Sequence, residues 1–175
     1  MSADVGGDDA RGMDTETELD FFRGLVERYS PSEDEEPARD YIVENADAMG
    51  FDVETDSVGN VIAETGNTDS DTEVLLTSHM DTVKGEIPVR VEGGNLYGRG
   101  SVDAKGPLAA MFLAAARCSA AESKVTVVAV VEEEKSGLGA RHVTGHRDAP
   151  DYLVNGEPSG WDTVTLGYRG ILRFR

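Results

Sequence analysis

The sequence is poor in cysteine, in long apolar runs and in positive charge, and each shortage excludes a class of protein. Its single cysteine, Cys118, rules out an internal disulfide and fits a reducing compartment, so we expect a cytoplasmic protein. The longest alanine-rich stretch, residues 107–121, is interrupted by Arg117 and is shorter than the roughly 20 residues that a membrane-spanning helix needs. Residues 1–14 are rich in glycine and aspartate without an apolar core, so they do not resemble a signal peptide. We therefore expect no membrane partner.

Positive charge is scarce because 34 acidic residues face 16 basic ones, and the net charge is −18. A surface of this sign repels nucleic acid and anionic membranes, so neither is an expected partner. Only four of the basic residues are lysines. An acidic, lysine-poor surface is typical of a halophilic protein, since the Debye length falls to roughly 3 Å at 1 M salt and self-repulsion is screened. An ordinary acidic cytoplasmic enzyme is the alternative.

Strands and helices are expected to alternate after a disordered acidic arm over residues 1–14. The apolar pattern predicts, in order, helices over residues 15–30 and 34–50, a strand pair over 51–64, a strand at 74–77, a helix over 105–121, a strand at 125–131, a helix after Gly139 and a strand at 152–154. This alternation predicts an α/β fold with a mostly parallel or mixed central sheet. Ligands of such sheets gather beyond the carboxyl ends of the strands.

Two chemically useful side chains, His79 and Asp81, follow the first apolar run. Strand side chains repeat every two residues, so both lie on one face. An imidazole in this position can bind a metal while the neighbouring carboxylate fixes its tautomer. An isolated His-x-Asp pair is also common as an incidental feature, so this motif alone leaves both interpretations open.

Carboxylates recur at three further element ends. Asp103 follows a glycine-rich stretch and precedes a helix, where it either binds a cation or caps the helix. Glu132, Glu133 and Glu134 come directly after the second apolar run, and their mutual repulsion at a partly buried strand end favours a cation, with a solvated charge run as the alternative. Glu157 follows the apolar residues 152–154 and is either a ligand or a turn residue.

Two other patterns carry less weight. His142 and His146 are four residues apart on an expected helix, like half of a helical zinc motif, but no glutamate follows His142 and we interpret both as surface residues. The glycine-rich stretch of residues 93–106 lacks the spacing of a phosphate-binding loop, so nucleotide binding is not expected.

Four strings occur in one order along the chain: SHMDTV, GRGSVDAKGPLAA, EEEKSGLGAR and NGEPS. In this order they resemble the zinc aminoacylase and carboxypeptidase family of metallopeptidases, which includes acetylornithine deacetylase, succinyl-diaminopimelate desuccinylase and glutamate carboxypeptidase. Within the family, the sequence is most similar to hydrolases that release lysine or ornithine from an acidic amino-group carrier protein. The resemblance covers about residues 16–175.

The resemblance implies two zinc ions in the complete enzyme, with cobalt as the alternative metal. The implied roles are metal ligation by His79 and Glu157 at the first zinc, a bridge between both metals by Asp103, ligation of the second zinc by Glu134, general base catalysis by Glu133, and orientation of His79 by Asp81. It also implies a cis peptide bond between Asp103 and Ala104.

The resemblance further implies a last zinc-binding histidine beyond residue 175 and an inserted dimerisation or lid domain. Residues 15–167 would then be the amino-terminal part of the catalytic domain, and residues 168–175 the first strand of the insertion, so the fold would be an incomplete three-layer zinc-peptidase domain. The implied activity is amide hydrolysis in lysine or arginine biosynthesis by a homodimer, on a small amino-acid derivative or an acidic carrier protein. The alternatives are an N-acyl-amino-acid deacylase, such as acetylornithine deacetylase, and an inert fragment that only binds metal.

Overall fold

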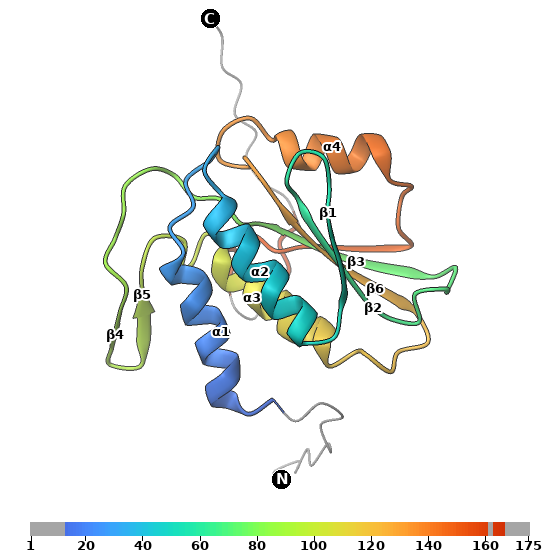
Figure 1. The fold of residues 1–175 in the computed structure, drawn as a ribbon, viewed down its shortest axis with the longest axis horizontal. Helices are drawn as coiled ribbons and strands as arrows, with labels where there is room; N and C mark the ends of the chain where they lie inside the picture. The colour runs from blue at the N-terminus through green and yellow to red at the C-terminus, as the bar shows by residue number, and fades with distance from the viewer. Residues whose placement is uncertain (1–12, 161–162, 167–175) are drawn as a thin grey trace, which may run out of the picture.

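A computed structural model describes residues 13–160 and 163–166, in which a sheet lies between two helical layers (Figure 1). In chain order the elements are α1 (Thr15–Glu27), α2 (Glu36–Ala48), β1 (Asp52–Thr55), β2 (Val61–Gly66), β3 (Glu73–His79), β4 (Arg90–Glu92), β5 (Asn95–Tyr97), α3 (Lys105–Ala116), β6 (Lys124–Val130), α4 (Leu138–His146) and β7 (Tyr152–Asn155). The three-layer α/β prediction is confirmed. No helix of the described part is long and apolar enough to cross a membrane.

The main sheet has five strands in the order β1-β2-β6-β3-β7 and is mixed. β1 and β2 pair antiparallel, as do β2 and β6, whereas β6, β3 and β7 run parallel. Leu76 of β3 is aligned with Val127 of β6 on one side and with Val154 of β7 on the other. The carboxyl ends of these three strands therefore meet at one edge of the sheet.

The core lies on both faces of β6, as its uninterrupted apolar sequence predicts. Val127 belongs to the larger cluster, under α1, α2 and α3, and Val128 belongs to the smaller cluster beside α4. Within the larger cluster, the ring of Phe112 meets Phe21 and Phe51 edge-on, with ring centroids 6.1 and 5.9 Å apart. The sheet is thus packed against apolar side chains on both faces.

Strand β7 is the exposed member of the sheet. Within the described residues it pairs only with β3. Its apolar side chains Tyr152, Leu153 and Val154 are 63%, 60% and 49% exposed.

The helix predicted over residues 15–30 ends at Glu27, and two further local elements differ more from the sequence-based prediction. The helix predicted over residues 105–121 ends at Ala116, and tight turns follow in which the N–H of Cys118 bonds the carbonyl of Ala115 at 2.8 Å, because the chain must reverse before β6. The ribbon of β4 and β5 was not predicted. Its two-residue turn is Gly93-Gly94, with φ values of 58° and 80° that glycine adopts without steric cost.

The predicted chain ends lie largely outside the described residues. Of the arm expected over residues 1–14, only Met13 and Asp14 are described, and the Asp14 carboxylate accepts the N–H of Thr17 at 2.8 Å and caps α1. The strand expected at residues 168–175 lies outside the described part.

Candidate metal centre

His79 is the last residue of β3, and its ring is buried at the carboxyl edge of the sheet. Its Nδ1 lies 2.9 Å from the backbone carbonyl oxygen of Asp81 and 3.3 Å from Asp81 Oδ1. Because a carbonyl oxygen only accepts hydrogen bonds, Nδ1 carries the proton and Nε2 is the nitrogen available to a metal. The predicted meeting of the two side chains is confirmed.

The carboxylate of Asp81 is fully buried and serves several donors at once. It lies within hydrogen-bond distance of Ser32 Oγ at 2.7 Å, the N–H of Glu133 at 3.0 Å and the N–H of Glu134 at 3.2 Å, in addition to His79 Nδ1. Burial by itself raises the pKa of Asp81, but the hydrogen bonds, first those from His79 and Ser32, hold that pKa below its ordinary value. The residue therefore remains ionised and joins three segments of the chain.

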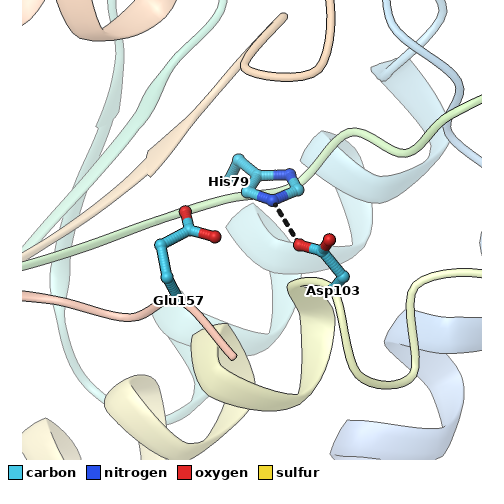
Figure 2. A group of neighbouring side chains, drawn as sticks. All are labelled: His79, Asp103 and Glu157. Atoms are coloured by element: carbon cyan, nitrogen blue, oxygen red, sulfur yellow. Dashed lines mark hydrogen bonds and ion pairs between the residues drawn. The ribbon is translucent and has the colours of Figure 1, made fainter. Parts of the chain in front are cut away.

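The side chains of His79, Asp103 and Glu157 converge from three separate segments (Figure 2). Their potential ligand atoms all lie within 4.8 Å of one another, and His79 Nε2 is 3.1 Å from Asp103 Oδ1. The Asp103–Ala104 bond is cis, as the resemblance implied. Asp103 does not cap α3, because the N-cap is Ala104 and no side chain bonds the helix end there.

Glu157 is held in place through the residue before it. The N–H of Gly156 donates to the carbonyl of Thr77 at 2.8 Å, and Ser78 Oγ donates to the carbonyl of Gly156 at 2.7 Å. A Cβ atom at position 156 would lie 2.6 Å from the terminal methyl of Met111, so a larger residue there would require that side chain to move. The turn after β7 is thereby fastened to β3, and Glu157 points back toward His79.

The three consecutive glutamates form a turn directly after β6. Glu132 has a φ of 53°, a left-handed conformation that costs a non-glycine residue about 1–3 kcal/mol. Glu133 Oε2 lies 4.0 Å from His79 Nε2. Glu134 lines a cavity of about 270 Å³ together with Asp103. Two of the three side chains thus face the centre, which argues against a simple solvated charge run.

The carboxylates of the centre repel one another. Burial raises the pKa of Glu134, and the charges of Asp103 and Glu133 raise it further. Burial also raises the pKa of Glu157, where His79 opposes the effect and Glu133 adds to it. Such repulsion is relieved by a cation.

The pKa of the His79 imidazole is raised as well, although burial acts on it in the opposite direction. Burial by itself would lower the pKa of His79, but the hydrogen bond and charge of Asp81 and the charge of Glu157 raise it to about 9. One imidazole nitrogen among several carboxylate oxygens is a donor set that suits a divalent transition metal such as zinc. The residues present therefore fit the metal that the sequence led us to expect.

The two remaining histidines lie elsewhere. His142 and His146 stack on α4 with ring centroids 4.0 Å apart, and His142 Nε2 lies 3.7 Å from Asp56 Oδ2. His146 is exposed, as interpreted, whereas His142 is partly buried. In the described part of the chain, neither joins a group of potential metal ligands.

Three residues near the centre were missed from the sequence: Ser32, Glu35 and Lys105. Ser32 bonds Asp81, and the buried Glu35 accepts the N–H of Glu132 at 3.1 Å. Lys105 is fully buried, and burial lowers its pKa to about 8, although the charge of Asp81 opposes the shift. The sequence feature that could have indicated a buried Lys105 is its position as the one charged residue of an otherwise apolar helix.

Comparison with known proteins agrees with this geometry. The model of peptidase family M20/M25/M40 matches residues 75–169. A candidate LysW-lysine/LysW-ornithine hydrolase of Thermococcus kodakarensis is 45% identical over 160 residues, which are 91% of this chain and 44% of that protein. The LysW-lysine hydrolase of Deinococcus radiodurans is 40% identical over 166 residues, with coverages of 91% and 44%. The chain thus spans less than half the length of these relatives.

Solved structures with the same fold include peptidases. A tripeptidase of Staphylococcus aureus superimposes with a TM-score of 0.70 at 25% identity, over 85% of this chain and 44% of that one. The YXEP protein of Bacillus subtilis, described as a dinuclear metal-binding peptidase of the M20 family, gives a TM-score of 0.62 at 15% identity, over 80% and 42%. Because the family model spans the stretch from β3 to Glu157 that builds the centre, the chain belongs to peptidase family M20/M25/M40.

Proposed function

We propose that this chain carries the metal centre of a hydrolase that releases lysine or ornithine from an amino-group carrier protein by cleaving an amide bond. The observation that carries the proposal is the 40–45% identity, over 91% of the chain, to the LysW-linked hydrolases of Thermococcus and Deinococcus. The convergence of His79, Asp103 and Glu157 supports the chemistry.

Each ligand has a place in this proposal. His79, Asp103 and Glu157 hold one zinc ion, and Asp103 and Glu134 contribute to a second. Zinc held there supplies Lewis acidity, which lowers the pKa of a water molecule and polarises the amide carbonyl. Asp81 keeps Nδ1 of His79 protonated, so that Nε2 points into the centre.

Glu133 is the proposed general base. Its Oε2 lies 4.0 Å from His79 Nε2, the nitrogen available to the metal, and its side chain is 46% exposed. It accepts a proton from the attacking water and delivers it to the departing amine. The partial exposure gives Glu133 the access to water that this role needs.

Hydrolysis of defined substrates tests the proposal. The protein as its gene encodes it would be incubated with zinc and carrier protein amide-linked to lysine or ornithine, and the free amino acid measured. A chelator-treated sample is the control. Release from the loaded carrier is expected. Cleavage of acetylornithine alone would make the protein a deacylase, and zinc binding without any hydrolysis would support an inert metal-binding fragment.

Salt should matter for this reaction. The chain has a net charge of −18, and the carrier protein is expected to be acidic. Association of two acidic surfaces is repelled at low ionic strength and recovers as salt shortens the Debye length to roughly 3 Å at 1 M. We propose that the protein works in a salt-rich cytoplasm.

Metal analysis should find nearer one zinc than two per chain. His79, Asp103 and Glu157 are three converging ligands and make one complete site, whereas the second site has only Asp103 and Glu134 in the described part. Elemental analysis after dialysis against a weak chelator would measure the stoichiometry. Two tightly held zinc ions in the isolated chain would contradict this ligand count.

Zinc affinity should rise with pH up to about 9. The pKa of His79 is raised to about 9, so below that pH the ring carries a second proton, on Nε2, which the metal must displace. Affinity should fall about tenfold per pH unit below that value for each proton displaced. Chelator competition across this pH range, with calorimetry in two buffers, measures both the affinity and the proton release. A constant affinity near neutral pH would show that the imidazole is already neutral.

A further inference from the structure

The loop between α1 and α2 runs beside the end of β3. Pro31 forms a parallel bridge with Thr82, whose N–H donates to the carbonyl of Ser30 at 2.9 Å. The N–H of Ser32 donates to the carbonyl of Thr82 at 3.2 Å. These backbone hydrogen bonds fix the loop next to the segment that follows His79. Two side chains of the loop, Ser32 and Glu35, bond residues of the centre or of the glutamate turn.

Ser32 reaches the centre through Asp81. Its Oγ donates to Asp81 Oδ2 at 2.7 Å, and the same oxygen accepts the N–H of Glu134 at 3.2 Å. The other oxygen accepts the N–H of Glu133 at 3.0 Å and lies 3.3 Å from His79 Nδ1. A single hydroxyl thus fixes the rotation of a carboxylate that orients the imidazole and the glutamate turn together.

Glu35 reaches the same turn from its other side. Glu35 is a buried residue, with only 8% of its surface exposed. One oxygen, Oε1, accepts the N–H of Glu33 at 3.0 Å and the N–H of Glu132 at 3.1 Å. In the described part of the chain, these two are the non-glycine residues with positive φ, at 77° and 53°. The carboxylate therefore holds both left-handed positions in place.

We propose that Ser32 and Glu35 are positioning residues, which together set the turn of Glu133 and Glu134 against His79. Ser32 acts through the carboxylate of Asp81, and Glu35 acts through the backbone of Glu132. The effect on catalysis rests on the proposed role of Glu133 as the base. The effect on the turn does not depend on that role.

Two substitutions at Glu35 and one at Ser32 test the proposal. Glu35→Ala should make the Glu132 amide exchange its hydrogen about tenfold faster, because the acceptor is lost. Glu35→Gln should partly restore protection, since its side-chain oxygen still accepts. Ser32→Ala should speed exchange at Glu134. In active protein, kcat should fall about 10- to 100-fold in Glu35→Ala, with KM and zinc content near wild type.

Matched controls separate positioning from stability. Ser30→Ala removes a buried hydroxyl of the same loop that bonds the carbonyl of Met80 and not Asp81. Glu36→Gln neutralises an exposed carboxylate that pairs with Arg39. Both controls should leave exchange at the glutamate turn and kcat near wild type.

Two results would overturn the inference. One is unchanged exchange at Glu132 and Glu134 in the Glu35 and Ser32 variants. The other is a loss of kcat in Ser30→Ala as large as that in Glu35→Ala, when both substitutions lower the free energy of unfolding by the same amount. Wild-type protein that does not hydrolyse the loaded carrier would reject the proposed function instead, while the exchange rates would still decide this inference.

Discussion

Glutamine at position 133 should lower the rate of hydrolysis by about 10²- to 10⁴-fold while zinc content stays near wild type. The substitution keeps the size and shape of the side chain but removes the proton acceptor. Glu133 lies outside the group formed by His79, Asp103 and Glu157, so its loss should not empty that site. Steady-state kinetics and metal analysis on the same preparation would measure both quantities.

Glu134→Gln is the matched comparison, one residue further along the turn. Glu134 faces Asp103 across their shared cavity, and burial together with the Asp103 charge raises its pKa. In the protein as its gene encodes it, this neutralisation should lower the occupancy of the second metal. If Glu133→Gln lost metal and Glu134→Gln lost only rate, the assignment of base and ligand would be shifted by one residue.

Asparagine at position 81 should weaken zinc binding about 10- to 100-fold. The Asp81 carboxylate accepts hydrogen bonds from Ser32 and from two backbone N–H groups, and it lies 3.3 Å from His79 Nδ1. An asparagine side chain offers only one oxygen, and its NH₂ group would face donors. The imidazole and the glutamate turn would lose their common support. Chelator competition would measure the affinity.

Asp56→Asn is a close control for that substitution. Asp56 also serves several donors, namely the N–H groups of Val58, Gly59 and Asn60 and the side-chain amide of Asn60, but in the turn between β1 and β2. It should cost stability without changing zinc affinity. Equal zinc affinities for the two variants at matched stability would show that Asp81 acts only on the fold.

The position of the site at the carboxyl ends of the strands was predictable, because polar site residues follow apolar runs in the sequence. Uninterrupted apolar runs marked β3 and β6, and His79 and the glutamates follow them directly. Parallel strands place such ends side by side, so the convergence followed from strand order. The assignment of roles came from the resemblance to a known family, since a lone aspartate such as Asp103 has several local explanations.

The contacts that were missed are tertiary and leave no local pattern. Ser32 and Asp81 are 49 positions apart, and Glu35 and Glu132 are 97 apart. The polar run around Ser32 is indistinguishable in sequence from an ordinary interhelical loop. The β4–β5 ribbon was missed for a different reason: its strands have three residues each, too short for periodicity to register.

Strand β7 has a practical consequence for work with this chain. In the described part its outer edge is unpaired, and its side chains are apolar and largely exposed. Such an edge pairs readily with another copy and promotes aggregation. The net charge of −18 opposes that association at low salt, but the salt that screens the charge also removes this protection. Concentrated samples should therefore self-associate as ionic strength rises, so solubility and substrate binding place opposite demands on the buffer.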